Sequence, residues 1–170
     1  MTGPRGPHPG PRIDRAWAMP SPATFTIAPI RALLVECGVG AGWVDPFAGN
    51  HSPAEWTNDL DAETEAHSHI DGGAFLGAML TEHARGVLLD PPYSLRQRHE
   101  CYKGVRQIAM SGVLTHAARV IQRGGLAICC GWNSNGLGKK RGFVLERVLL
   151  VAHGAQHNDT IVTVERKVSA

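Results

Sequence analysis

Apolar residues recur with the period of a helix in the segment TIAPIRALLVECG, residues 26–38. The periodic apolar positions are Ile27, Ile30, Leu33 and Leu34. Such spacing places them on one face of a helix. Pro29 suits the first turn, where a backbone N–H has no helical partner, and Gly38 can end the helix. The pattern therefore predicts a helix within residues 26–38.

Short apolar runs that end in turn-forming residues follow this helix, and they predict strands. The first three are GWVDPFAGN, AEWTNDLD and AHSHIDGGAFLGAML, the last of which ends its strand at Asp71 and turns into a helix. RGVLLDPPY has an unbroken apolar run, which is typical of a strand buried on both faces. After a helix over 107–122, we expect strands in GGLAICCGW, VLERVLLVAHG and DTIVTVERK, the last two joined by the turn-prone AQHND.

Alternating strands and helices predict the fold class, which is α/β with a mostly parallel sheet that ends in an antiparallel hairpin. Residues 1–23 are rich in Pro and Gly and lack apolar periodicity, so we expect a disordered lead-in there. Residues 24–170 are then expected to form one domain. In open sheets of this kind, ligands bind beyond the carboxyl ends of the strands.

Carboxylates stand at the predicted ends of successive strands. The side chains at these ends are Asp45, Asp59, Asp71 and Asp90, with Trp132 and Asn133 after a fifth strand. Like charges in one crevice are unfavourable unless a ligand hydrogen-bonds them. The pattern therefore predicts a ligand site at this edge of the sheet.

Composition and charge narrow the class of protein. The 170 residues are 43% hydrophobic, enough for the core of one domain. The sequence shows no apolar run of about 18 residues and no signal-peptide block, so we expect a cytoplasmic protein without a membrane partner. The net charge of +2 conceals an asymmetry, because residues 32–84 hold nine acids and no Lys or Arg, whereas residues 85–170 hold thirteen Lys or Arg and five acids. The basic half could attract a polyanion or form solvated faces.

Two motifs resemble those of a known enzyme family. DPFAGN, residues 45–50, is similar to the DPFxGxG cofactor loop of class I S-adenosylmethionine-dependent methyltransferases that methylate amino groups of DNA bases, and DPPY, residues 90–93, matches their catalytic motif. TIAPIRALL resembles the helix that packs beside the methionine end of the cofactor in that family. The resemblance covers residues 25–168 and is strongest to small methylases of phage or prophage type. It implies a Rossmann-like class I methyltransferase fold and S-adenosyl-L-methionine as cofactor.

The resemblance also implies a cofactor site. The implied cofactor-binding residues are Ile27, Pro29, Asp45, Phe47, Ala48, Gly49, Asn50, Asp59 and Asp71. Gly49 would let the backbone approach the amino acid part of the cofactor, Asp59 would bind the ribose hydroxyls, and Asp71 would read the adenine amino group. The chain departs from the family at Asn50, where many relatives have Ser or Gly. Only 14 positions separate Asp45 from Asp59, too few for the usual helix, so the pocket is expected to be open or completed by another chain.

The DPPY motif has a chemical rationale in this family. An exocyclic amine on a base is a poor nucleophile because its lone pair is delocalised into the ring. The Asp90 carboxylate and the Pro91 carbonyl would accept its two hydrogens, while Pro91 and Pro92 hold the backbone in place. Tyr93 would stack on a base swung out of its helix. These expected catalytic residues predict a site-specific DNA methyltransferase. An Asp at the start of the motif favours adenine N6 over cytosine N4.

No separate target-recognition domain is evident, so sequence choice would come from the loops at 94–106 and 132–142, from a homodimer or a partner subunit, or hardly at all. The residues expected to contact nucleic acid are Arg96, Arg98, Lys103, Arg106, Asn133, Lys139, Lys140 and Arg141. The Gly- and Asn-rich segment GWNSNGLGKKRGF predicts either a mobile loop that grips phosphates or a solvated linker.

The Cys and His residues suggest no further cofactor. The four cysteines lack a CxxC or zinc spacing, and the nine histidines form no convincing triad, so we expect no metal. HGAQHND is interpreted as a hairpin turn rather than a hydrolase site, since it lacks a matching nucleophile. Two other functions stay open, an RNA base methyltransferase of the same fold and a catalytically silent nucleic-acid-binding subunit.

Overall fold

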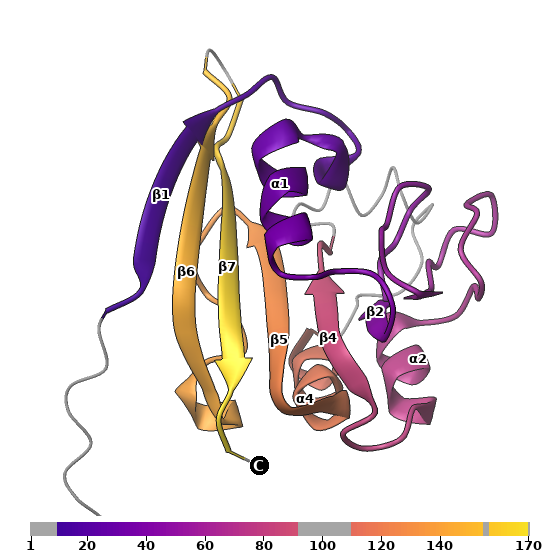
Figure 1. Cartoon of the computed structure of the whole chain (residues 1–170). Helices are drawn as coiled ribbons and strands as arrows, with labels where there is room; N and C mark the ends of the chain where they lie inside the picture. The colour runs from indigo at the N-terminus through magenta and orange to yellow at the C-terminus, as the bar shows by residue number, and fades with distance from the viewer. Residues whose placement is uncertain (1–9, 92–109, 155–156, 170) are drawn as a thin grey trace, which may run out of the picture.

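The computed structural model describes residues 10–91, 110–154 and 157–169. Strands lie side by side in one sheet, with helices on both of its faces (Figure 1). The strands are β1 (Arg12–Trp17), β2 (Trp43–Asp45), β3 (Trp56–Thr57), β4 (Ala84–Leu89), β5 (Ile121–Gly131), β6 (Phe143–Ala152) and β7 (Thr160–Lys167). The helices are α1 (Ala28–Glu36), α2 (Gly72–Ala78) and α4 (Met110–Val120), and two 3-10 turns are η1 (Thr24–Thr26) and η2 (Lys139–Arg141).

The strand order confirms the predicted fold class. The seven strands of the sheet have the order β1-β6-β7-β5-β4-β2-β3. β7 is antiparallel to β5 and to β6, and the other neighbouring pairs are parallel. We call the edge where β2, β4 and β5 end the carboxyl edge, and the opposite edge, where β4, β5 and β6 begin, the amino edge.

Both faces of the central strands are buried, which explains their unbroken apolar runs. In Figure 1, α1 covers the near face of the sheet and α4 the far face. Val87 and Ala127 pack in the core under α2 and α4, whereas their strand neighbours Leu88 and Ile128 pack under α1. Alternation along a strand sends successive side chains to opposite faces. A strand with helices on both sides therefore needs apolar residues at every position.

Residues 1–23 were expected to be disordered, and strand β1 corrects this expectation for Arg12–Trp17, whereas residues 1–9 lie outside the described residues. β1 adds a parallel strand beside β6, with Arg12 opposite Arg147 and Trp17 opposite Ala152. The sequence RIDRAW has no apolar face, so its periodicity gave no signal. Backbone pairing and an ion pair hold it instead, since Arg147 Nε donates to Asp14 Oδ2 at 2.7 Å.

The segment before α2 also differs from expectation. A strand was expected to end at Asp71, but this segment contributes one isolated bridge, between Asn58 and Ser68. Asp71 instead caps α2, because its carboxylate accepts a hydrogen bond from Ala74 N at 3.0 Å. α4 and the later strands occupy the predicted places, although β5 already begins at Ile121.

None of the helices in the described ranges is long and apolar enough to cross a bilayer.

Candidate active site at the carboxyl edge

Asp45 ends β2 as a fully buried carboxylate. It accepts hydrogen bonds from Phe47 N at 2.9 Å and from Ser52 Oγ at 2.6 Å. Burial raises the pKa of Asp45, the two hydrogen bonds lower it, and the nearby charges of Asp90 and Asp59 raise it, with a net pKa of about 7. Asp45 therefore titrates close to neutral pH, and its main visible task is to shape the turn that follows β2.

Asp59 holds the loop that resembles a cofactor loop. It is 7% exposed and accepts from Gly49 N and from Asp61 N, both at 2.9 Å. Gly49 has φ +53°, in the left-handed region that favours glycine, and a Cβ there would meet no atom within 4 Å. Ala48 N also donates to Asn58 O at 2.9 Å. The loop is thus held by Asp59 and Asn58, while the space that a Cβ of Gly49 would enter stays open.

Asn58 is a buried residue that the sequence analysis missed. Its amide group donates to Pro46 O at 3.1 Å and to Ile70 O at 2.9 Å. Its Oδ1 accepts from Ser68 Oγ at 2.7 Å and from Ile70 N at 3.1 Å. One side chain therefore joins the loop after β2 to the segment that leads into α2. Its place between Thr57 and Asp59 at a strand end was the available signal.

The other implied cofactor residues fall into two groups around this loop. Phe47 and Ala48 are buried, whereas Asn50 is exposed and its Oδ1 accepts from Glu65 N at 2.8 Å. Asp71 is exposed at the start of α2. Because a Cβ on Gly72 would meet the Phe47 ring at 3.0 Å, the start of α2 lies against the loop.

Asp90 directly follows β4 at the carboxyl edge. The Thr24 hydroxyl donates a hydrogen bond to its carboxylate, and this bond lowers its pKa. Burial has the larger effect and raises the pKa of Asp90 to about 6. Pro91 is buried beside it, whereas Pro92 and Tyr93 lie outside the described residues. Thr24 had no sequence signal, because it stands far from Asp90 along the chain.

A cavity of about 360 Å³ opens beside Asp90. Its walls come from the segment before α1, the end of β5 and the turn between β6 and β7. The lining residues that matter most for chemistry are Asp90, Thr24, Trp132, His157, Asn158 and Thr160. Apart from Asp90, they offer hydrogen-bonding groups and an aromatic ring. The volume falls in the range of small-ligand pockets, which begins at about 300 Å³.

His153 ties the walls of this cavity together. It is 6% exposed, and its Nδ1 lies 2.9 Å from Ala18 O and its Nε2 2.8 Å from Thr160 Oγ1. Ala18 N also donates to Ala152 O at 3.1 Å. Ile27, at the N-terminal end of α1, lines the same cavity, and Pro29 lies in the first turn of α1. The helix that resembles the cofactor helix therefore does begin next to Asp90.

The basic residues expected near the target base are not gathered there. Arg96, Arg98, Lys103 and Arg106 lie outside the described residues. Asn133 follows β5 at the carboxyl edge, but η2, which is Lys139–Arg141, precedes β6 at the amino edge. The segment is also anchored, because the buried Glu165 accepts from Leu137 N at 2.5 Å and from Gly138 N at 3.0 Å.

Comparisons with known proteins agree with this fold. No family model matches the sequence, and no curated protein matches it. The structure is similar to 1,6-didemethyltoxoflavin-N1-methyltransferase from Burkholderia thailandensis, solved with 1,6-didemethyltoxoflavin and S-adenosylhomocysteine. That TM-score is 0.56 at 13% identity, over 82% of this chain and 76% of the other. TrmN from Thermus thermophilus gives a TM-score of 0.57 at 18% identity, over 84% of this chain and 49% of TrmN. The fold is Rossmann-like, as in these methyltransferases.

Proposed function

We propose that this chain is an S-adenosylmethionine-dependent methyltransferase that acts on an exocyclic amino group of a DNA base, with adenine N6 as the first candidate. The observation that supports this most is Asp90, whose carboxylate lines a cavity at the carboxyl edge and is followed by the buried Pro91. These residues would supply the two hydrogen-bond acceptors that the chemistry needs. The fold and its methyltransferase neighbours support the same reaction class.

The residues around the loop after β2 fit the proposed cofactor. The open side of Gly49 leaves space for a ligand against the backbone. Asp59 accepts from Gly49 N and so places a carboxylate against this loop, which suits a sulfonium cation. Each Asp59 oxygen already accepts one backbone hydrogen bond, and a carboxylate oxygen can accept about two, so each can still bind a ribose hydroxyl. The bound cofactor would supply the methyl group.

Asp90 would act by binding and orienting the amine. With a pKa of about 6, its carboxylate is mainly ionised at neutral pH and can accept one amino hydrogen while Pro91 O accepts the other. Drawing both hydrogens into these bonds favours a tetrahedral nitrogen and turns its lone pair away from the ring. Thr24 donates to Asp90 and would fix the direction of the carboxylate. The ionised carboxylate can then receive the proton that the amine releases.

The test is to incubate the protein with unmethylated DNA, or with structured RNA, and labelled S-adenosyl-L-methionine, and to analyse the nucleosides by mass spectrometry. We expect N6-methyldeoxyadenosine from the parent and none from Asp90→Ala, with the cofactor affinity of Asp90→Ala within about tenfold by calorimetry, which is about 1.4 kcal/mol. Asp159→Ala, an exposed acid in the β6–β7 turn, is the matched control and should stay active.

The pattern of methylated products decides between the alternatives. N4-methylcytosine would change the base and keep the role of Asp90, and methylation of RNA alone would change the nucleic acid. A protein that binds the cofactor and methylates neither DNA nor RNA would refute a nucleic-acid methyltransferase.

A free small heteroaromatic amine is a second candidate substrate. The described lining of the Asp90 cavity contains no Lys or Arg, so this cavity favours a neutral ring over a phosphate group. The Burkholderia neighbour was solved with a small molecule, 1,6-didemethyltoxoflavin, bound. A panel of free heteroaromatic amines, assayed beside DNA with the same labelled cofactor, tests this candidate directly.

A further inference from the structure

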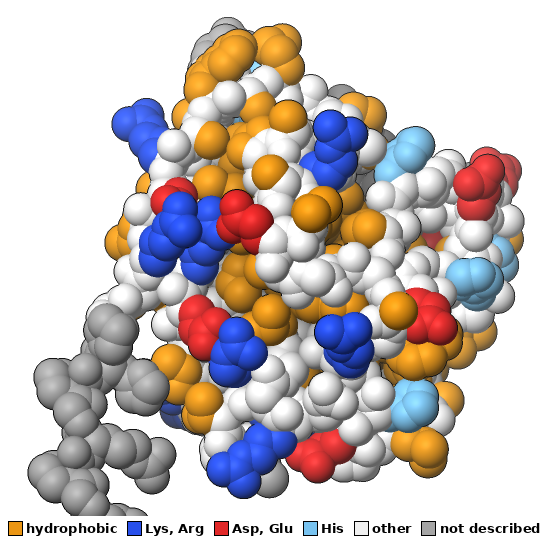
Figure 2. All heavy atoms as spheres, in the orientation of Figure 1, with side chains coloured by type: hydrophobic (Ala, Val, Ile, Leu, Met, Phe, Trp, Pro, Cys, Tyr) orange, Lys and Arg blue, Asp and Glu red, His pale blue; other side chains and the backbone are white. Residues whose placement is uncertain are grey.

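Cationic side chains from neighbouring strands gather at the amino edge, away from Asp90. Figure 2 shows most Lys and Arg over the left and lower parts of the visible face, with some Asp and Glu among them, whereas its right-hand part carries Asp, Glu and His. We call the cationic set the basic edge. It comprises Arg12 of β1, Arg85 of β4, Arg123 of β5, Lys139, Lys140 and Arg141 of η2, Arg147 of β6 and Arg166 of β7.

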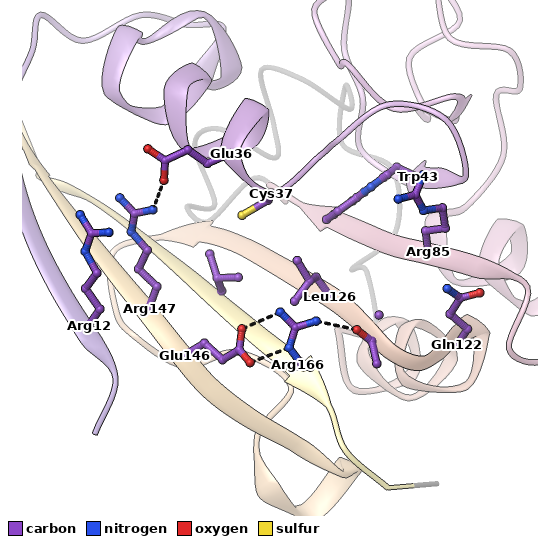
Figure 3. A pocket seen from close by; sticks show the side chains of 13 residues that line it. Arg12, Glu36, Cys37, Trp43, Arg85, Gln122, Leu126, Glu146, Arg147 and Arg166 are labelled. Atoms are coloured by element: carbon purple, nitrogen blue, oxygen red, sulfur yellow. Dashed lines mark hydrogen bonds and ion pairs between the residues drawn. The ribbon is translucent and has the colours of Figure 1, made fainter. Parts of the chain in front are cut away.

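Half of the basic edge surrounds a cavity of about 470 Å³ on the face that carries α1 (Figure 3). Arg12, Arg85, Arg147 and Arg166 line this cavity together with Glu36 and Glu146, above a floor that includes Leu126. Arg147 pairs with Asp14 and Glu36. Arg166 holds Glu146 with two nitrogens, at 2.6 and 2.9 Å. These pairs fix two of the guanidinium groups in place.

Arg12 of the basic edge pairs with Asp14 at 3.0 Å, but the rest of its charge is not neutralised within the described chain. There, the side chains of Arg85, Arg123, Lys139 and Lys140 form no ion pair with a carboxylate. All four are exposed. Unpaired exposed cations release bound counterions when phosphates replace them, which favours binding to a polyanion. These four side chains are therefore the part of the basic edge that a partner would contact most strongly.

The basic edge is also carried on a fixed frame. Arg85 N donates to Gly42 O at 2.8 Å, which ties its backbone to the loop before β2. In η2, Gly142 caps the turn with φ +83°, and Gly142 N donates to Lys139 O at 3.0 Å. The Glu165 carboxylate binds the two amides just before η2. Prearranged cations lose less conformational entropy on binding than cations on a loose loop.

We infer that the basic edge is a phosphate-binding surface that holds the backbone of the nucleic-acid substrate at a distance from the target base. The inference rests on the proposed function for the identity of the partner. Five neighbouring strands of the sheet contribute to it, in the order β1-β6-β7-β5-β4. At about 4.8 Å per strand spacing they span roughly 19 Å, which matches a row of regularly spaced phosphates better than one small anion.

The separation from Asp90 sets the length of nucleic acid required. Arg85 and Asp90 are five residues apart on and after β4, or about 17 Å at about 3.3 Å per residue. Strand β6 extends nine residues from Phe143, next to η2, to Ala152 at the carboxyl edge, a distance of roughly 30 Å. At about 3.4 Å per base pair, these distances equal about five to nine steps of duplex. A substrate that reaches both edges must extend at least that far beyond the target base.

Fluorescence anisotropy with labelled duplexes tests this without requiring turnover. Affinity for the parent protein should rise as the duplex lengthens from about 6 to about 20 base pairs, and log affinity should fall steeply with log salt. The variant that combines Arg85→Gln, Arg123→Gln, Lys139→Gln and Lys140→Gln should lose most of the gain with length. Its salt slope should flatten by about 0.9 per lost phosphate contact, up to roughly three to four units.

The control variant combines Arg15→Gln and Arg31→Gln, two exposed cations outside the basic edge. It should keep the parent salt slope to within about one unit, and thermal unfolding should show that both variants are folded. A salt slope unchanged in the four-fold variant, or reduced equally in the control, would overturn the inference. The same would follow if the shortest duplex bound the parent as tightly as the longest. A protein that binds DNA in this way but never methylates it would refute the proposed function and leave the basic edge standing.

Discussion

Replacing Asn58 by Asp exchanges one buried NH₂ group for an oxygen with almost no change in shape. The parent amide donates to Pro46 O and Ile70 O. The ionised carboxylate of the variant would donate neither bond, and its negative charge would lie against these two carbonyl oxygens. Losing two hydrogen bonds costs about 2 kcal/mol, and leaving the buried Pro46 carbonyl and the part-buried Ile70 carbonyl without these donors adds about 1–3 kcal/mol. We expect Asn58→Asp to lower the free energy of unfolding by about 3–5 kcal/mol, a large part of the roughly 5–15 kcal/mol typical of a domain.

The loss should depend on pH with a defined sign. A buried carboxyl has a folded-state pKa above its unfolded value, as Asp45 does at about 7. Stability from such a group is present at low pH and is lost as pH rises through the folded pKa. The difference in unfolding free energy between Asn58→Asp and the parent should therefore be larger at about pH 8 than at about pH 5.

Urea unfolding followed by tryptophan fluorescence at both pH values measures this difference. Asn133→Asp is the matched control, because Asn133 is exposed and its Oδ1 accepts from Asn135 N, a role that Asp can retain. It should change the free energy of unfolding by less than about 0.5 kcal/mol. If Asn58→Asp is as stable as this control at the higher pH, Asn58 does not join the two segments as argued.

Three further predictions concern the candidate site. The rate of methyl transfer should increase through about pH 6 as Asp90 ionises. Thr24→Val should shift this increase to higher pH, because it removes a hydrogen bond that lowers the pKa of Asp90, and an unshifted pH–rate profile would contradict the Thr24–Asp90 hydrogen bond. Asp59→Ala should weaken cofactor binding more than about tenfold in calorimetry, because the loop at Gly49 loses its acceptor, whereas equal affinities would exclude this role. His153→Ala should lower the free energy of unfolding by about 1–3 kcal/mol and increase proteolysis within residues 18–24; protection equal to the parent would show that His153 does not hold this wall.

The parts of the fold that sequence reasoning predicted are those with local periodicity. Helix α1 and strands β4 to β7 have apolar patterns within their own segments that match the elements they form. Their type and order could therefore be predicted from the sequence. β1 could not, because its strand is held by a neighbour that lies more than a hundred positions later in the chain. A polar strand held by backbone pairing gives no hydrophobic signal.

The same limit applies to the candidate site. The strand-end positions of Asp45, Asp59 and Asp90 could be predicted, because each lies at or just after the end of a strand. Thr24 and His153 were missed because their partners, Asp90 and Ala18, are distant in sequence. The position of Lys139, Lys140 and Arg141 at the amino edge was missed for another reason. Residues 132–142 run from one edge of the sheet to the other, and composition alone does not tell which end of a connection carries the charge.

The pairing of β1 with β6 also determines when the Asp90 cavity can form during synthesis. Ala18 and His153 are 135 residues apart, so the Ala18 end of the segment that follows β1 lacks this contact until His153 has left the ribosome. At about 5–20 residues per second, that delay is roughly 7–27 seconds. The strands that carry Asp45, Asp59 and Asp90 precede β6 and can pair earlier. A nascent chain would thus assemble the proposed cofactor side first and complete the wall of the Asp90 cavity last, so the proposed activity would have to wait until the sheet is complete.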